Sequence, residues 1–356
     1  MNINIIAGSF NDNGGKPSGW INKLASALNT LNNSITLING GTWDTLNNVY
    51  HNLPTDEVVL WFADVPNDKP KLIKKLKFRY PKIILVTSKR NLDNEYSVMN
   101  LISRSLEVKS NLMIEFTGSR DNILSTILDP LGNVFIYEES DINKIAESLN
   151  KRLLLLKSFS RVGSKCLGDA VSVVTNSEIL EFIEIVKVQA EQFHTIIHEA
   201  NTTRMLGNSS FRCQRGFPSF RADSNIFVSR RNIDKRNISV EEFVCIESIP
   251  GSDDVGYFGI NKPSVDSPVQ LKLYHALPNV NYMLHSHTYI EGAPITTECI
   301  PCGALEETQQ ILNVCHNDAT NFCVNVRGHG SIVFAKEPSF MSNIKWIPRP
   351  IPEVML

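Results

Sequence analysis

The sequence lacks any long apolar run. About 18 consecutive apolar residues are needed to span a membrane, and no segment reaches that length. The first residues, MNINIIAGSFNDNGG, contain neither the basic n-region nor the apolar h-region of a secretory signal peptide. We therefore expect a cytoplasmic protein with no membrane partner.

An excess of charge of one sign is also missing. The chain has 35 basic and 37 acidic residues, which give a formal net charge of -2. Proteins that bind nucleic acid or anionic membranes usually carry a basic patch or a strongly basic domain. The balanced charge gives no electrostatic footprint for such a partner. We expect a small-molecule substrate and no nucleic acid.

Cysteine is scarce and odd in number. Seven cysteines between Cys166 and Cys323 suit free thiols in a reducing compartment better than a disulfide framework. Cys299 and Cys302 have the CxxC spacing of a zinc ligand pair. A structural zinc ribbon completed by Cys315 or Cys323 is therefore an alternative, although no second CxxC follows. The H-x-E and P-C-x-x-C signature of zinc nucleobase deaminases is absent, so that class is excluded.

The chain is too long for a single typical core. Its 356 residues predict two domains, on the usual scale of about 100–200 residues each. Between residues 156 and 177, in LKSFSRVGSKCLGDAVSVVTNS, Gly, Ser and Lys interrupt the apolar pattern and indicate a hinge. We predict a first domain at residues 1–156 and a second at residues 170–356.

Short apolar runs alternate with amphipathic stretches in the first domain. The runs are INIIAGS, SITLING, EVVLWFADV, KIILVTSKR, NLMIEFTGS and NVFIYEES. Runs of about 4–8 Ile, Leu and Val residues suit strands buried on both faces, and the stretches between them are long enough for crossover helices. The pattern predicts an α/β fold with a parallel, doubly wound sheet of the Rossmann or flavodoxin type.

A Gly-rich loop, GSFNDNGGKPSG at residues 8–19, follows the first predicted strand and precedes a helical pattern. Such a loop can place backbone N–H groups and a helix N-terminus around an anion. It matches neither GxGxxG nor the phosphate-loop spacing, and a polar turn is the alternative that we favour. We assign no cofactor-binding residue here, and no family resemblance identifies the ligand of this domain.

The second domain begins with an amphipathic pattern. Between Glu178 and Ala200, apolar residues recur at helical spacing and predict a helix with one face on a core. His194 and His198 stand at positions i and i+4 beside this face. Such a pair can chelate a metal, and a solvated helix edge is the alternative that we favour.

Two histidines one residue apart end an apolar run in MLHSHTY. In an extended strand residues i and i+2 point to the same side, so His285 and His287 present their imidazoles together. His329 follows between Gly328 and Gly330, which allow close backbone approach. Three imidazoles with an open fourth position are typical of catalytic zinc. We predict a Zn²⁺ site, or a site for another divalent metal.

The order of motifs around these histidines resembles the class II aldolase/adducin family. The resemblance runs from about Thr195 to Lys336 and rests on five segments in the family's order: GNSS with Arg212, FVSRRNIDKRNISVEEFVCI, KPSVDSPVQLKLYHALPNVNYMLHSHT, CIPCGALEE and RGHGSIVFAK. The similarity is to the branch of zinc-dependent sugar-phosphate aldolases and 4-epimerases. It implies an α/β/α second domain with a mainly antiparallel sheet.

The resemblance also implies the roles of individual residues. It makes His285, His287 and His329 the zinc ligands and Asp266 the catalytic acidic group beside them. It implies substrate binding by four further residues, which are Gly207, Asn208, Ser229 and Ser264. A homo-oligomer is expected, because many members of the family complete their site with a residue of a neighbouring subunit.

The implied function is that of a zinc-dependent lyase of the aldolase type, which acts on a small hydroxycarbonyl compound, a sugar phosphate, through a metal-stabilised enediolate. A sugar-phosphate 4-epimerase is the alternative, since the segment SVDSP around Asp266 is more similar to the corresponding motif of the epimerases. A non-enzymatic scaffold of the adducin kind lacks the three histidines that this chain has. A further alternative is a nucleotide- or sugar-nucleotide-binding protein whose aldolase-like domain is a metal-binding platform with altered activity.

The sequence departs from the family's pattern in two places. The second serine expected before the acidic residue is Val265. Arg230 or Arg231 could instead contact a phosphate or carboxylate, and the alternative that we favour is that both are surface residues. The final segment, SFMSNIKWIPRPIPEVML, contains no tyrosine that could serve as general acid. The general acid is therefore unassigned, with three candidates near the motifs: Tyr274, Tyr289 and Glu307.

Overall fold

The computed structural model describes residues 1–53, 58–65, 69–91, 96–119, 122–159, 162–197, 207–213, 226–315 and 320–355. The chain divides into two compact units. Unit 1 consists of residues Met1–Ser160 and Ile351–Leu356, and unit 2 consists of residues Arg161–Pro350. Each unit has its own sheet and its own core.

The sheet of unit 1 is built on parallel strands in the order β2-β1-β3-β4-β5. Their bounds are β1 Asn2–Phe10, β2 Ser34–Gly41, β3 Val58–Asp64, β4 Ile84–Arg90 and β5 Leu112–Gly118. The central strands are almost wholly buried, as the continuous apolar runs predicted. This strand order is that of flavodoxin-like folds, so the predicted parallel α/β sheet is confirmed.

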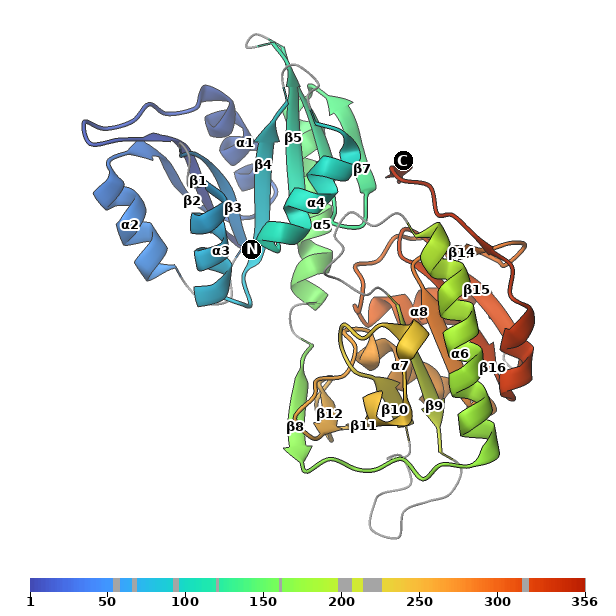
Figure 1. The fold of residues 1–356 in the computed structure, drawn as a ribbon. Coiled ribbons are helices and arrows are strands. Elements are labelled where there is room, and N and C mark those ends of the chain that lie inside the picture. The colour runs from blue at the N-terminus through green and yellow to red at the C-terminus, as the bar shows by residue number, and fades with distance from the viewer. Residues whose placement is uncertain are drawn as a thin grey trace. The chain divides into compact units, whose positions relative to one another are not determined.

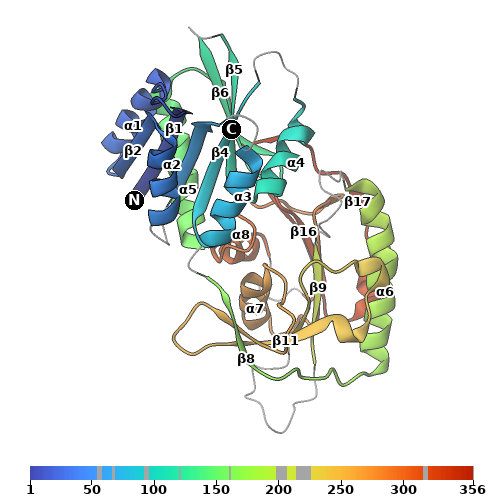
Figure 2. The same cartoon turned by 60° about the vertical axis from the view of Figure 1, so that its left-hand side comes forward.

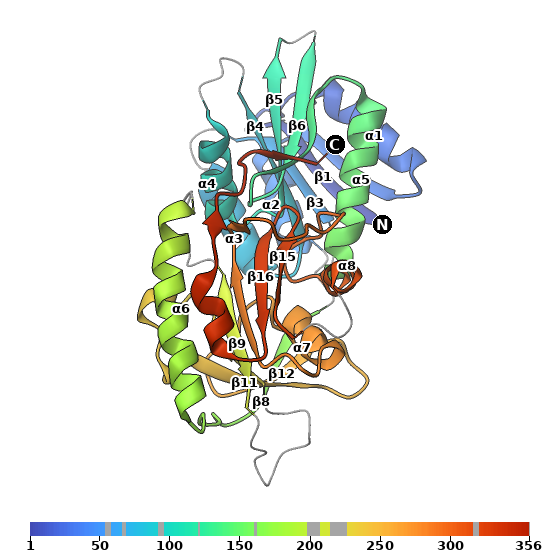
Figure 3. The same cartoon turned by 90° about the vertical axis from the view of Figure 1, so that its right-hand side faces the viewer.

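Helices cover both faces of this sheet (Figures 2 and 3). α1 (Gly19–Thr30) and α5 (Ile142–Phe159) pack on one face, where they share a core with Ile3, Ile5 and Leu60. The opposite core holds Ile6, Val59 and Trp61 together with residues of α2 (Trp43–Asn52), α3 (Lys69–Arg79) and α4 (Val98–Val108). Since successive residues of a strand point to opposite faces, the alternation of these residues feeds both cores. The sheet is doubly wound.

One strand near the edge of this sheet, β6, was not predicted. β6 (Ile123–Leu128) runs antiparallel to β5, and β7 (Asn133–Glu139) runs antiparallel to β6. Where the chain passes from β5 to β6, Ser119 N donates to Asn122 O at 3.1 Å. The segment ILSTIL was not recognised as a strand, and its apolar pattern does not show its antiparallel direction.

The last strand of the chain belongs to the same edge. β18 (Glu353–Val354) pairs in parallel with β7, and Figure 1 places the C-terminus beside β7. Backbone bonds from Glu353 N to Gly132 O and from Met355 N to Val134 O fix the pairing. Sequence patterns grouped these residues with the second domain, because a two-residue strand carries no periodicity of its own.

The sheet of unit 2 is antiparallel except at one edge. Its order is β15-β16-β13-β9-β10-β11-β12-β8, and only the pair β12 and β8 is parallel among the described strands. The bounds are β8 Ser164–Gly168, β9 Asn208–Arg212, β10 Ile226–Ser229, β11 Phe243–Ser248, β12 Val255–Phe258, β13 Tyr282–Ser286, β15 Phe322–Val326 and β16 Gly330–Ala335. The mainly antiparallel sheet is as predicted.

Helices lie on both faces of this sheet as well, which gives the α/β/α layers that were predicted (Figure 3). α6 (Ser177–Ile196) and the 3-10 helix η3 (Pro338–Asn343) share one core with Phe211. α7 (Ser267–Ala276) and α8 (Glu306–Val314) share the other core with Met283. α6 follows the apolar face predicted from the sequence. His194 is a residue of α6, and His198 lies outside the described residues.

Short elements complete unit 2. The 3-10 helices η1 (Lys235–Asn237) and η2 (Val240–Glu242) connect β10 to β11, and β14 (Tyr289–Ile290) pairs with β17 (Trp346–Ile347). All seven cysteines are free thiols, as expected. Within the described ranges of both units, no helix has the length and apolarity needed to cross a bilayer.

Candidate metal centre and catalytic site

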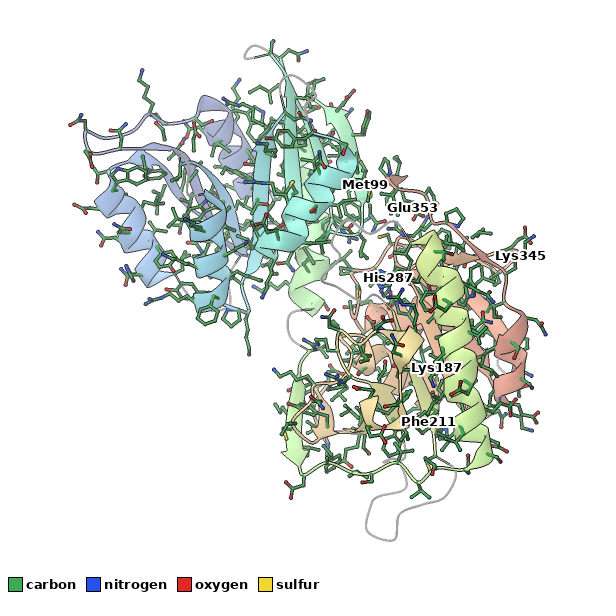
Figure 4. All side chains as sticks on the ribbon, in the orientation of Figure 1. Met99, Lys187, Phe211, His287, Lys345 and Glu353 are labelled. Carbon is green, nitrogen blue, oxygen red and sulfur yellow. The ribbon has the colours of Figure 1, made fainter. Side chains whose placement is uncertain are left out.

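The three predicted histidines meet at one end of the sheet of unit 2. His285 is in β13, His287 follows its last residue, and His329 lies in the turn between β15 and β16. Because β13 and β16 are paired strands, the turn brings His329 beside the other two. One ring nitrogen from each histidine lies within 4.8 Å of the others. Figure 4 labels His287 at this place.

Two glycines allow the neighbouring strands to approach the histidines closely. A Cβ on Gly330 would lie 2.0 Å from the carbonyl oxygen of Ser286, and a Cβ on Gly207 would lie 2.4 Å from the carbonyl oxygen of His285. Both glycines have positive φ angles, +150° and +78°, which other residues adopt at a cost. The glycine next to His329 therefore has the structural reason that the sequence predicted.

The hydrogen bonds of two histidines leave one ring nitrogen of each unused. The Nδ1 of His285 lies 2.9 Å from the carbonyl oxygen of Ser331, and the Nδ1 of His329 lies 2.7 Å from Oε1 of Glu307. Each imidazole is 2% exposed, yet its Nε2 has no hydrogen-bond partner. Buried polar atoms without a partner are rare in native proteins, and ligand histidines are usually held through their other nitrogen in this way. The donor set fits a divalent cation.

The electrostatic environment is consistent with a cation at this point. Burial lowers the pKa of His285 to about 4, and the neighbouring His329 adds to this effect. Burial also lowers the pKa of His287 well below 6.5. For His329 burial acts downward, but Cys302 and Glu307 outweigh it and raise its pKa well above 6.5. Cys302 and Glu307 therefore favour positive charge at His329, while the other two rings are neutral and keep a lone pair.

Asp266 lies next to the histidines, at the start of α7. Its Oδ2 is 4.0 Å from Nε2 of His285 and accepts a hydrogen bond from Nδ2 of Asn208 at 2.8 Å. Its Oδ1 accepts a hydrogen bond from Sγ of Cys302 at 3.1 Å. Burial acts to raise the pKa of Asp266, but His329 and His285 outweigh it, so the pKa is lowered. An ionised carboxylate therefore faces the three imidazoles.

Two of the four residues predicted to bind substrate, Asn208 and Ser264, contact this carboxylate. Asn208 also donates to Oγ of Ser264 at 3.2 Å and accepts from Gln270, and Ser264 Oγ lies 3.4 Å from Oδ2 of Asp266. Ser229, at the end of β10, accepts a hydrogen bond from Ser209 N through its Oγ and another from Ser264 N through its carbonyl oxygen. Gly207 precedes Asn208. The structure therefore brings Gly207, Asn208, Ser229 and Ser264 together.

The two arginines differ in their surroundings. Arg230 forms an ion pair with Glu242, so its guanidinium is already engaged. Arg231 is exposed as a residue. Partial burial of its side chain lowers its pKa, and the nearby carboxylate of Asp266 acts in the opposite direction with a smaller effect. Of the two, Arg231 is the one whose charge interacts with Asp266 and Cys302.

The three candidates for a general acid lie in different places. Tyr274 is in the core, where its hydroxyl lies 3.1 Å from Oγ of Ser210. The hydroxyl of Tyr289 accepts a hydrogen bond from Gly328 N at 3.0 Å, so it supports the turn that carries His329. Glu307 is bonded to His329 Nδ1. Each of the three has a structural contact that accounts for its position.

The sequence did not predict the position of Cys302. Its CxxC spacing with Cys299 suggested a zinc ribbon with other cysteines, but no such group of cysteines assembles within the described residues. Cys302 instead forms a second cluster with Asp266 and His329, whose possible ligand atoms lie within 4.8 Å of one another. The spacing of CIPCG from the histidines gave no signal for this contact, because it depends on the loop before α8.

The fold and the three histidines define unit 2 as a three-layer α/β/α domain with a candidate metal centre. Residues 189–318 match the family model for the class II aldolase and adducin N-terminal domain. The resemblance predicted from the sequence is confirmed over this segment of unit 2. No family model is matched in unit 1, and a search of curated proteins finds no match.

Solved structures similar to this chain fall into two groups. L-fuculose-1-phosphate aldolase of Thermus thermophilus is 13% identical, with 46% of this chain and 87% of that chain covered and a TM-score of 0.28. YgbL of Klebsiella pneumoniae, described as a putative aldolase/epimerase/decarboxylase, is 13% identical over 48% and 84% of the two chains, with a TM-score of 0.33. A DNA/pantothenate metabolism flavoprotein of Streptococcus pneumoniae is 14% identical over 43% and 98%, with a TM-score of 0.35.

Proposed function

We propose that unit 2 is a zinc-dependent lyase of the class II aldolase type, which acts on a small hydroxycarbonyl compound, a sugar phosphate. One observation carries the proposal: three imidazoles converge beside a buried carboxylate, and two of them have a buried Nε2 without a partner. The aldolase/adducin match over residues 189–318 supports the reaction class. We further propose that the protein is a homo-oligomer, as the resemblance implies.

His285, His287 and His329 would hold the metal ion. Ser331 and Glu307 fix the first and last of these rings by accepting their Nδ1–H groups, which leaves the Nε2 of each ring available to the metal ion. When bound, a divalent cation supplies positive charge that polarises a carbonyl and stabilises the negative charge that develops on its oxygen.

Asp266 would carry the proton. Its carboxylate is ionised and lies 4.0 Å from Nε2 of His285, so a substrate group placed at the centre of the three imidazoles is within its reach. Asn208 and Ser264 orient it by donating to Oδ2. Asp266 therefore takes a proton at a carboxylate oxygen and returns it later in the reaction, as a general base and then a general acid.

An anionic substrate suits the rim of the site. Arg231 is exposed and lies close enough to Asp266 for the carboxylate to affect its pKa, and guanidinium groups bind phosphate or carboxylate through two parallel hydrogen bonds. Gly207, Asn208, Ser229 and Ser264 add backbone and hydroxyl groups near the carboxylate. These contacts support a phosphorylated substrate.

A sugar-phosphate 4-epimerase is the second candidate. It rests on the identity of Asp266, which stands where aldolases of the family usually have Glu. Both reactions use the same site, because both begin with polarisation of a substrate oxygen and movement of a proton. The products separate them, since a lyase forms two shorter fragments and an epimerase keeps the carbon chain intact.

Metal analysis followed by a substrate screen tests the proposal. The purified protein is expected to hold close to one zinc ion per chain and to lose it to a strong chelator. A panel of ketose and aldose phosphates is then incubated with the protein, with the chelated form as control, and the products are identified by mass. Failure to bind any divalent cation, or turnover that persists unchanged in the chelated form, would contradict the proposal.

A further inference from the structure

Cys302 lies in the loop before α8 and turns its thiol toward the candidate metal centre. Its Sγ donates to Oδ1 of Asp266 at 3.1 Å. The sulfur, a carboxylate oxygen of Asp266 and a ring nitrogen of His329 all lie within 4.8 Å of one another. The resemblance to the aldolase/adducin family gave this residue no role, and the proposed mechanism does not use it.

The cluster around Cys302 and the cluster of three histidines share His329. The Nδ1 of His329 is occupied by Glu307, so its Nε2 serves both clusters, and this atom is buried without a hydrogen-bond partner. The Nε2 of His285 is also buried without a hydrogen-bond partner. These two atoms, on side chains that are 2% exposed, point independently to a cation beside the two rings, one of which, His329, also belongs to the cluster of Cys302.

Three imidazoles leave one position of a tetrahedral zinc ion to be filled. Asp266 and Cys302 are the two groups that cluster with His329 as further possible ligands among the described residues. Asp266 already accepts hydrogen bonds from Asn208 and Ser264 at Oδ2, which hold the carboxylate in its present orientation. The thiol has Asp266 as its acceptor, and a thiol that meets zinc is deprotonated outright. Sulfur therefore competes well for the fourth position.

We propose that Cys302 is the fourth ligand of the cation held by His285, His287 and His329 when no substrate is bound. On metal binding the S–H bond breaks, the proton passes to the Asp266 carboxylate, and a sulfur electron pair forms the bond to the metal. No electron is transferred, so neither an oxidant nor a reductant is required. This inference rests on the proposed function, because it assumes that the three histidines bind a metal.

The ligand set has two consequences. A thiolate selects borderline and soft cations such as Zn²⁺ and Co²⁺ over Mg²⁺ and Mn²⁺. A closed site of four protein ligands must also open before substrate reaches the metal, either by release of Cys302 or by expansion to five ligands. Cys302 would thus act as a coordination switch between a resting state and a substrate-bound state.

Cobalt substitution tests the proposal directly. The metal-free protein is loaded with Co²⁺, and its absorption is recorded in the near ultraviolet, where thiolate-to-cobalt charge transfer absorbs, and in the visible region, where cobalt bound by any ligand absorbs. The wild type is expected to show both features. Cys302→Ser is expected to keep the visible feature and lose the charge-transfer band. Cys315→Ser, which changes a cysteine outside both clusters, is the control and keeps both.

X-ray absorption of the zinc-loaded wild type is the second measurement, and it does not depend on a variant that folds. A sulfur shell at about 2.3 Å beside nitrogen at about 2.0 Å is expected. Bound metal without a sulfur shell, or a charge-transfer band that survives in Cys302→Ser, overturns the role of Cys302 and leaves the proposed function intact. Absence of any bound metal overturns the proposed function itself.

Discussion

The Nδ1 of His329 lies 2.7 Å from Oε1 of Glu307, and both side chains are buried to within 2% exposure. Glu307 is the second residue of α8, and His329 is in the turn between β15 and β16. The bond therefore joins two separate elements and fixes the direction of the third imidazole. Burial raises the pKa of Glu307, while the neighbouring His329 acts in the opposite direction.

Glu307→Gln is expected to weaken zinc binding by roughly 10–100-fold, the usual effect of removing the partner of a ligand histidine. The amide keeps the shape of the side chain but cannot supply the negative charge that orients and strengthens the ligand. Competition with a chromophoric chelator measures the affinity. Glu306→Gln, at the exposed neighbouring position, is the control, and equal affinities for the two variants would argue against this role.

His285→Ala is expected to remove the metal from the purified protein, because it deletes one of the converging ligands. Stabilisation by added zinc should also disappear, since a ligand that binds only the folded state raises the melting temperature. His275→Ala, on the exposed side of α7, should keep both properties. Zinc content at the wild-type level in His285→Ala would be incompatible with the metal assignment.

Asp266→Asn is expected to retain metal and to lose turnover by at least about 100-fold, the lower end of the contribution of a positioned proton-transfer group. The amide can still contact its neighbours but cannot take up a proton. Metal content and turnover are measured on the same sample. Asp253→Asn, whose side chain pairs with Lys272 at the surface, serves as the matched change, and normal turnover in Asp266→Asn would remove its proton-transfer role.

Gly330→Ala is expected to destabilise unit 2 more than Gly292→Ala does, by roughly 1–3 kcal/mol, the cost of forcing extra atoms into a filled space. Both glycines have positive φ, but a Cβ at Gly330 would meet the backbone of Ser286 and His287, whereas a Cβ at Gly292 has nothing within 4 Å. The free energies of unfolding are compared in urea. Equal losses in the two variants would show that the φ angle alone decides the cost.

Lys77→Met is expected to stabilise unit 1 near pH 7, by about 1 kcal/mol after allowance for solvent screening. Burial, together with Lys109, lowers the pKa of Lys77 from 10.5 to about 8. Between these values the unfolded chain binds more protons, so the wild type gains stability as pH rises from 8 to 10.5. The advantage of the variant should therefore shrink across this window.

Lys75→Met, an exposed position on the same helix α3, is the control for the lysine change. Urea unfolding at about pH 7 and about pH 10, on either side of the folded-state pKa, measures the difference between each variant and the wild type. A gain for Lys77→Met that stays constant with pH would mean that apolar packing, and not the cost of burying a charge, produces it.

The sequence predicted those parts of the site that have a local pattern. The strand pattern predicted that His285 and His287 lie together, and they do, although only His285 is in β13 and His287 follows its last residue. The glycine beside His329 marked the close approach of β16 to β13. The contact of Cys302 with Asp266 and the bond of Glu307 to His329 were not predicted. Both depend on how the loop and helix α8 pack on the sheet, which no spacing in the sequence encodes.

The fold shows the same division. Continuous apolar runs predicted the buried parallel strands of unit 1 and the apolar face of α6. The reversal into β6 was missed, because the apolar pattern of ILSTIL does not show in which direction the strand runs. The assignment of β18 to the first sheet was missed for another reason, since two residues pair there only because β7 offers an open edge.

The return of β18 to the sheet of unit 1 means that the chain passes between the two units twice. After a cut at the first crossing the two fragments are still linked by the pairing of β18 with β7, so limited proteolysis there is expected to yield a nicked protein that migrates as a single species until it is denatured. During synthesis, β18 can pair with β7 only after the whole of unit 2 has been translated.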